Sequence, residues 1–141
     1  MRRRARKKRR FQASSACFIS TAVLLASCQD QTTGPGNGTG EIVFPDSNVS
    51  YSAHVQPLFD RRCNASGCHD SGTRAGDLSL QSYEEATERP GTIVPGNPDG
   101  SVLVQSIEGI LGRRMPLNST PLLENQIKGI RQWVLEGAKN N

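Results

Sequence analysis

The chain has 141 residues, which is enough for one small domain and argues against two. Its 17 lysines and arginines outnumber its 13 acidic residues, so the formal net charge is +4. A basic protein of this size would suit a nucleic acid or an anionic membrane, provided that the charge belongs to the folded part. Hydrophobic residues make up 35% of the chain, which is too many for a chain that must be disordered.

The basic charge is concentrated at the N-terminus. Residues 1–10 contain eight basic side chains, and the first acidic residue is Asp30. An apolar run over residues 16–26 follows, and it is shorter than the roughly 20 residues that a membrane-spanning helix needs. This order is typical of a secretory signal. Without residues 1–27 the chain keeps nine basic and thirteen acidic residues, so its net charge becomes −4 and nucleic-acid binding loses its main support.

The expected signal ends at a cysteine. The segment Leu25-Ala26-Ser27-Cys28 resembles the bacterial lipoprotein box, in which the cysteine is lipidated and becomes the mature N-terminus. The alternative is an ordinary signal peptide with a cysteine at this place by chance. Gln29 rather than an aspartate follows, and by the same resemblance this favours the outer membrane over the inner one. We therefore expect a lipoprotein of the cell envelope that faces the periplasm.

The rest of the chain divides into a linker and a domain. We expect residues 28–48 to be the lipidated cysteine and a flexible linker, because residues 34–40 are rich in glycine. Ile42-Val43-Phe44 fits either a short strand or a segment that docks on the domain. The domain is expected over residues 49–141.

Two short helices are expected in the first half of this domain. One begins with Ser52 as a cap and carries Pro57, which limits it to a late start or a kink. The other covers residues 82–88 and begins with a capping box. We expect a solvated helix face for its three glutamates, Glu84, Glu85 and Glu88.

Two further helices are expected in the second half. Asn97 fits a helix cap with Pro98 at the first helical position. The last helix covers about residues 122–137 by its apolar spacing. Gly129 lies inside it and is expected to allow close approach of the first helix or of a cofactor. The prediction is an all-α domain with long loops, in which a cofactor fills the middle that four short helices leave open.

The most informative segment reads C-x-x-x-x-C-H. Cys63, Cys68 and His69 form a longer variant of the C-x-x-C-H motif, in which two thiols bind haem c covalently and the histidine binds its iron. Gly67 lets the longer loop turn without strain. Two alternatives stay open: a Cys63–Cys68 disulfide, and a zinc site, which is short of the usual four ligands.

A second iron ligand is expected from Met115. It precedes Pro116 in a loop between two helices, and a thioether there suits the sixth position of a His/Met haem. The alternative is a methionine that fills a gap in the core. For His54 a surface or packing role is favoured over iron ligation. Arg113 and Arg114 are candidate contacts of the haem propionates, and solvated surface charge fits them equally well.

Residues 51–138 resemble the single-domain bacterial c-type cytochromes of the broad class I type. The matching segments come in the order of that family and are residues 55–59, the C-x4-C-H motif, residues 94–101, Met115-Pro116 and residues 133–138. The resemblance implies an all-α, class I cytochrome c-like domain around one haem, with His69 and Met115 as axial ligands. It also implies that the first and last helices pack together. The longer spacing between the cysteines is a departure from the common family pattern.

Together these features predict a monohaem c-type cytochrome that carries one electron between redox partner proteins. A net charge of −4 favours partners with a basic docking face. No Ser/His/Asp set, acid pair or phosphate loop is apparent in the sequence, so we do not expect an enzyme in its own right. Two alternatives remain: a haem-bearing subunit of a larger oxidoreductase, and a disulfide-stapled lipoprotein without haem.

Overall fold

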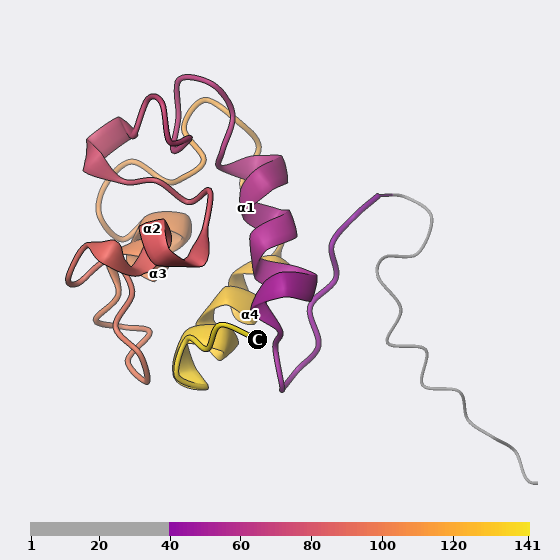
Figure 1. Ribbon diagram of the computed structural model, residues 1–141. Coiled ribbons are helices and arrows are strands. Elements are labelled where there is room, and N and C mark those ends of the chain that lie inside the picture. Colours follow the sequence, from indigo (N-terminus) through magenta and orange to yellow (C-terminus); the bar gives the residue numbers. More distant parts are fainter. Residues whose placement is uncertain (1–39) are drawn as a thin grey trace, which may run out of the picture. The chain divides into compact units, whose positions relative to one another are not determined.

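The computed structural model describes residues 40–141, so the expected signal peptide and the lipid anchor at Cys28 lie outside the described residues. Within this part the regular elements are all helical (Figure 1), which confirms the all-α prediction. In chain order they are η1 (Tyr51–Val55), α1 (Gln56–Arg62), η2 (Ala75–Asp77), α2 (Tyr83–Glu88), α3 (Val102–Glu108) and α4 (Glu124–Leu135). None of the helices in residues 40–141 has the length and apolar character needed to cross a membrane.

The first helix begins earlier than the sequence indicates. Ser50, rather than Ser52, is the cap, and its Oγ accepts the backbone N–H of Ala53 at 3.2 Å. The chain makes one π-helical turn, η1, before it continues as α1. Pro57 then lies in the first turn of α1, directly after this π-helical turn, and its missing N–H leaves one carbonyl of the preceding turn without a helical donor. The wide first turn therefore accommodates the proline without ending the helix.

The far end of the chain fixes this helix start (Figure 1). The backbone oxygen of Asn141 accepts the N–H of Ser52 at 2.9 Å, and its side-chain Oδ1 accepts the N–H of Tyr51 at 2.8 Å. The ring of Tyr51 also packs on Trp133 of α4, with 5.5 Å between the ring centroids. The packing between the first and last helices that the family resemblance implies is present at this contact.

The start of α3 differs from the prediction. The helix begins at Val102, and Pro98 lies outside it. Asn97 instead closes a turn, in which its Oδ1 accepts the N–H of Gly100 at 3.0 Å. The cap position belongs to the fully buried Ser101, whose Oγ accepts the N–H of Val94. The Asn-Pro pair thus forms a turn that leads to the helix, because an asparagine caps a turn as readily as a helix.

The segment before the first helix docks on α4, which decides between the two options left open for it. The backbone N–H of Phe44 donates to Oδ1 of Asn125 at 2.7 Å, and Nδ2 of Asn125 donates to the Phe44 oxygen at 3.0 Å. The Phe44 side chain is 3% exposed. Its ring occupies the place that a β-carbon of Gly129 would need. The close approach expected at Gly129 is therefore made by Phe44, and not by the first helix or a cofactor.

A carboxylate at the end of α4 secures the same segment further along. The two oxygens of Glu136 accept the backbone N–H groups of Asn48 at 2.7 Å and Val49 at 2.9 Å. Gln132 donates to Glu136 at 2.8 Å. The Gln132 bond, with help from the two backbone N–H groups, holds the pKa of Glu136 below its usual value.

The core consists of side chains from η1, from α1 to α4 and from the segments that flank them. Its largest fully buried members are Trp133, Phe59, Leu58, Leu80 and Ile130. Burial of a side chain of this size stabilises the fold by about 1.5–3 kcal/mol. Cys63 and Met115 are partly buried and pack against this core. Both therefore lie where the core meets the loops that carry them, the loop after α1 and the loop between α3 and α4.

Candidate functional site

The predicted site residues meet at one cavity of about 610 Å³. Cys63, Cys68 and His69 reach it from the loop after α1, and Met115 reaches it from the loop between α3 and α4. Much of the remaining wall is apolar and is formed by Leu78, Leu80, Val102, Leu103, Ile107, Pro116, Leu117 and Leu122. A volume of this order and a mostly apolar wall with a few polar groups are typical of a small-molecule or cofactor site.

The longer cysteine loop closes on itself. The N–H of His69 donates to the backbone oxygen of Cys63 at 3.1 Å, so the two ends of the motif lie together. Inside the loop, the N–H of Cys68 donates to Ala65 at 2.9 Å. Gly67 has a φ of +86°, a conformation that other residues rarely adopt. The sequence prediction that Gly67 provides the turn is confirmed, and the loop fits its two extra residues without displacing His69 from Cys63.

The two cysteines differ in their surroundings. Both are free thiols in this structure, which is the form that can bond to the vinyl groups of a haem. Cys63 is half-buried and Cys68 is exposed. Burial raises the pKa of the Cys63 thiol to about 12, so this group is uncharged at neutral pH. An uncharged thiol costs little to keep against the apolar edge of the core.

His69 has one ring nitrogen directed at the protein backbone. Its Nδ1 lies 3.4 Å from the backbone oxygen of Leu78, and its own backbone oxygen accepts the N–H of Leu80 at 2.9 Å. Histidines that bind a metal usually donate their other ring N–H to such an acceptor. With the proton on Nδ1, the lone pair of Nε2 is available for iron.

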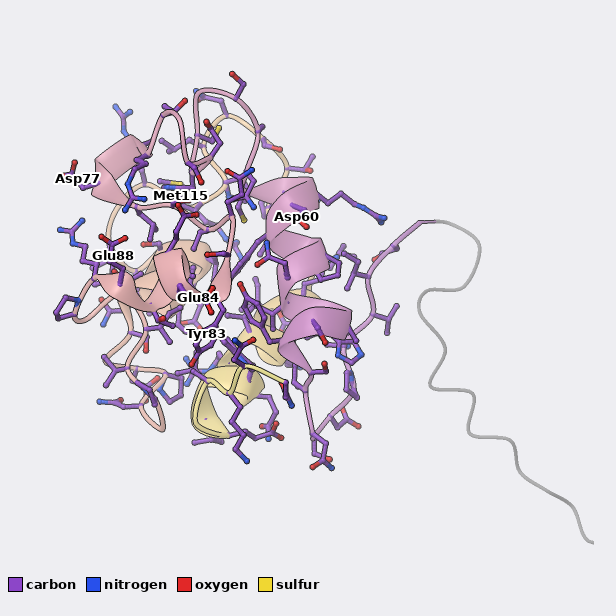
Figure 2. All side chains as sticks on the ribbon, viewed as in Figure 1. Asp60, Asp77, Tyr83, Glu84, Glu88 and Met115 are labelled. Carbon is purple, nitrogen blue, oxygen red and sulfur yellow. The ribbon has the colours of Figure 1, made fainter. Side chains whose placement is uncertain are left out.

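Met115 is held by α3. Its N–H donates to the backbone oxygen of Ser106 at 2.9 Å, and its side chain is partly buried. Ser106 and Ile107 of α3 line the same cavity. Figure 2 shows Met115 in the upper part of the domain, the part that also contains the loop after α1. Met115 and α3 therefore line the same cavity as His69, which is the arrangement that a second iron ligand needs.

The arginines expected at the site are elsewhere. Arg113 and Arg114 are exposed, and neither is among the residues that line the cavity. The Nε of Arg114 donates to the backbone oxygen of Ile107 at 2.8 Å, so this side chain braces the end of α3.

Two other arginines line the cavity in their place, and the sequence interpretation missed both. Arg62 donates to the backbone oxygen of Thr120 at 2.6 Å, and Arg89 donates to that of Gly76 at 2.7 Å. Arg62 directly precedes Cys63, and this adjacency was the available signal. Arg89 comes to the cavity only through the fold, and no local pattern marks it.

His54 has the packing role that the sequence favoured. Its ring lies against Phe44, with 5.7 Å between the ring centroids, and its Nδ1 lies 3.3 Å from the backbone oxygen of Ser50. It is not among the residues that line the cavity. His69 is therefore the histidine that borders it.

These residues fit a haem c. The cavity offers two thiols for thioether bonds, an imidazole with a free nitrogen, a thioether sulfur and apolar walls for the ring. Val102 and Leu117, although apolar, are 46% and 43% exposed at the wall, and a bound ring would cover them. Among residues 40–141 no three His, Cys, Asp or Glu side chains are grouped so that they could hold a metal ion by themselves.

Comparison with known proteins supports the same class. A family model described as Planctomycete cytochrome C matches residues 66–116, a segment that contains Cys68, His69 and Met115. The match supports a cytochrome c-like domain, a class that binds haem c covalently and carries electrons. The matched segment begins between the two cysteines, so Cys63 is assigned from the motif alone. Neither a curated protein nor a solved structure matches this chain.

Proposed function

We propose that this protein is a one-electron carrier with a single covalently attached haem c. The observation that carries the proposal is that Cys63, Cys68, His69 and Met115 come from two separate loops and line one largely apolar cavity. Nothing in the local sequence requires the Met115 loop to meet the cysteine loop. If Met115 only filled a gap in the core, there would be no reason for the His69 ring to line the same cavity.

Each residue has a distinct role in this proposal. Cys63 and Cys68 would hold the haem by thioether bonds, and His69 and Met115 would supply the two side-chain ligands of its iron. Leu117 and Val102 line the same cavity and would keep water from the haem. Haem c, when bound, supplies an iron that changes between the ferrous and ferric states. The chain then needs no catalytic acid, base or nucleophile.

The proposal extends to the location and the partners. We infer from residues 1–28 that the protein is exported and anchored by a lipid on Cys28, with the outer membrane favoured. The remaining chain has nine basic and thirteen acidic residues. Its partners are redox proteins that present a basic face to it, with a small and transient interface.

The experiment that tests this proposal asks whether haem is covalently bound to the chain. The full chain is expressed in a bacterial host that matures c-type cytochromes, and the protein is run on a denaturing gel and stained for haem. We expect haem to remain with the chain. In the double variant Cys63→Ser with Cys68→Ser the stain disappears. A colourless wild-type protein from such a host contradicts the proposal.

The variant Cys28→Ser is the matched control, since it changes a cysteine outside the site. We expect it to keep its haem and to leave the membrane fraction. Haem loss in this variant contradicts the assignment of the two sites to separate roles. Continued membrane association contradicts the proposed lipid anchor but not the proposed haem site.

A further inference from the structure

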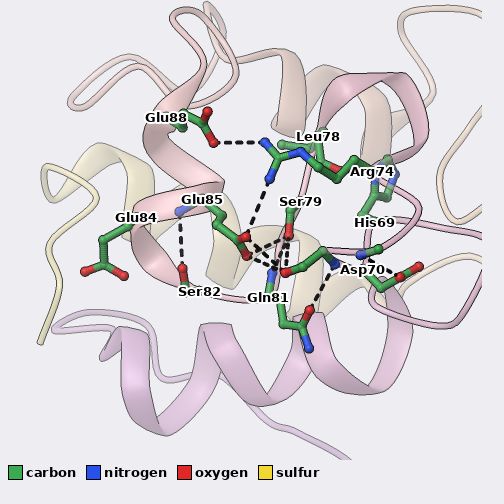
Figure 3. A network of polar contacts seen from close by, with 12 residues as sticks. His69, Asp70, Arg74, Leu78, Ser79, Gln81, Ser82, Glu84, Glu85 and Glu88 are labelled. Atoms are coloured by element: carbon green, nitrogen blue, oxygen red, sulfur yellow. Dashed lines mark hydrogen bonds and ion pairs between the residues drawn. The ribbon is translucent and has the colours of Figure 1, made fainter.

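One carboxylate of α2 ties together both ends of the loop that begins at His69. This loop, residues 69–80, is called the His69 loop below. Glu85 accepts a hydrogen bond from Oγ of Ser79 at 2.8 Å, near the end of the loop. It also accepts the hydroxyl proton of Ser71, near the beginning of the loop, whose Oγ lies 2.9 and 3.0 Å from the two carboxylate oxygens (Figure 3). Arg74, in the middle of the loop, lies 3.5 Å from the same carboxylate.

This arrangement departs from the expectation of a solvated acidic face on α2 at one of its three glutamates, Glu85. Glu84 is exposed, as expected, and Figure 3 shows it pointing away from the contacts that Glu85 makes. Glu88 is exposed as well, although it pairs with Arg74 at 2.9 Å. Glu85 is turned to the His69 loop. The hydrogen bond from Ser79, followed by that from Ser71 as the smaller cause, holds the pKa of Glu85 below its usual value. The carboxylate is therefore an ionised acceptor at neutral pH.

The serine that donates to Glu85, Ser79, is next in sequence to Leu78, the residue whose oxygen faces the His69 ring. Ser79 is fully buried and directly follows Leu78, whose backbone oxygen lies 3.4 Å from Nδ1 of His69. Hydrogen bonds of this type are usually about 2.7–3.2 Å long. Because the contact is long, a small movement of the Leu78 carbonyl decides whether the bond is made or lost. The position of that carbonyl depends on what holds Ser79.

We propose that Glu85 is a positioning residue: through Ser79 it fixes the Leu78 carbonyl against Nδ1 of His69, and so sets the reduction potential of a haem held at this site. A hydrogen bond to the second ring nitrogen makes a histidine a stronger donor to its metal. A stronger donor favours the ferric state and lowers the potential. The inference rests on the function proposed above, in which His69 is the axial ligand.

The test compares reduction potentials of the haem-loaded protein. Glu85→Gln weakens and Ser79→Ala removes the hydrogen bond between Ser79 and Glu85. We expect both variants to shift the reduction potential in the positive direction. The expected change in the equilibrium constant for reduction is about three- to ten-fold, where ten-fold corresponds to about 59 mV for one electron. Ser79→Ala removes no charge, so its shift cannot come from the loss of a nearby negative charge.

Two control variants separate positioning from other effects. Glu84→Gln removes the same charge from the same helix at an exposed position, and we expect it to leave the potential near that of the wild type. Ser82→Ala removes the cap of α2, whose Oγ accepts the Glu85 N–H at 3.2 Å. It lowers the melting temperature by weakening the helix, and we expect the potential to stay unchanged, because the carboxylate keeps its serine partners.

A spectroscopic readout tests the ring contact directly. In the wild type we expect slow exchange of the His69 Nδ1–H by NMR, and faster exchange in Glu85→Gln and Ser79→Ala. Potentials and exchange rates equal to those of Glu84→Gln overturn the positioning role while leaving the proposed function intact. A wild-type chain that never carries haem overturns the proposed function and, with it, this inference.

Discussion

The ring of Phe44 lies against the α-carbon of Gly129, in the space that a β-carbon would fill in any other residue. Glycine within a helix costs about 1 kcal/mol relative to alanine. Here the cost is offset by the burial of an aromatic side chain that arrives from the far end of the domain. The segment before the first helix is therefore part of the folded structure from Ile42 onward.

The first prediction tests this contact. Gly129→Ala should lower the free energy of unfolding by about 1–3 kcal/mol because the new methyl group overpacks the Phe44 site. Phe44→Ala alone should lower it by about 3–5 kcal/mol. In the Phe44→Ala background, Gly129→Ala should be neutral or stabilising, because the helix gains propensity and nothing is displaced. Urea denaturation of the four proteins measures this, and equal effects of Gly129→Ala in both backgrounds contradict it.

A second prediction concerns acid stability through Glu136. Its pKa is lowered in the folded state, chiefly by the bond from Gln132, from an ordinary value near 4.5. The folded form thus binds this proton less readily than the unfolded form. The stabilisation is present above that value and is lost as the pH falls through the lowered pKa.

The variant Glu136→Gln provides the comparison. Its stability should be below that of the wild type at pH 7, and the difference should shrink as the pH is lowered below 4.5. Denaturation with urea at a series of pH values measures the difference. A gap that stays constant down to acid pH shows that the charge of Glu136 adds nothing to its hydrogen bonds.

Iron ligation by Met115 is the third prediction. Met115→Leu keeps nearly the same volume but has no sulfur, so packing is preserved and ligation is lost. We expect its ferric visible spectrum to change and its reduction potential to fall, because a methionine ligand raises the potential. A spectrum and potential like those of the wild type show that Met115 only fills space.

The fourth prediction uses two arginines as a matched pair. Arg62→Gln removes a positive charge from the cavity wall and should lower the reduction potential, because a nearby positive charge favours the ferrous state. Arg113→Gln removes the same charge from an exposed loop, where solvent and salt screen it. Redox titrations in 0.15 M salt should show the larger shift for Arg62→Gln. Equal shifts indicate that only net charge matters.

Local signals predicted the local parts of this structure. The capping serine of α2 and the glycine turn between the cysteines were both identified, because each depends on residues that are neighbours in the sequence. The Asn97-Pro98 pair was misplaced, since the same two residues suit a turn or a helix start. Ser101, which takes the cap position, makes its bond to Val94 across the loop and leaves no helix signature.

The parts that could not be predicted depend on the tertiary fold. Arg89 lies far from the cysteine motif in sequence and reaches the cavity wall only after α2 is in place. The role of Glu85 depends on which face of α2 meets the His69 loop, and three glutamates in one short helix offer no way to choose among them. Docking of the segment that contains Phe44 was one of two options that the sequence left open, and no local pattern could choose between them because the partner, Gly129, is on the last helix.

The docked segment at Phe44 also sets how far the site can travel from a membrane. In the lipid-anchored form proposed above, only residues 29–41 separate the anchor at Cys28 from Ile42. A chain of that length spans at most about 50 Å even when fully extended. In this proposed form the cavity would stay within the reach of that linker from its own bilayer, so an electron donor or acceptor would have to come equally close, as a protein in or tethered to the same membrane does.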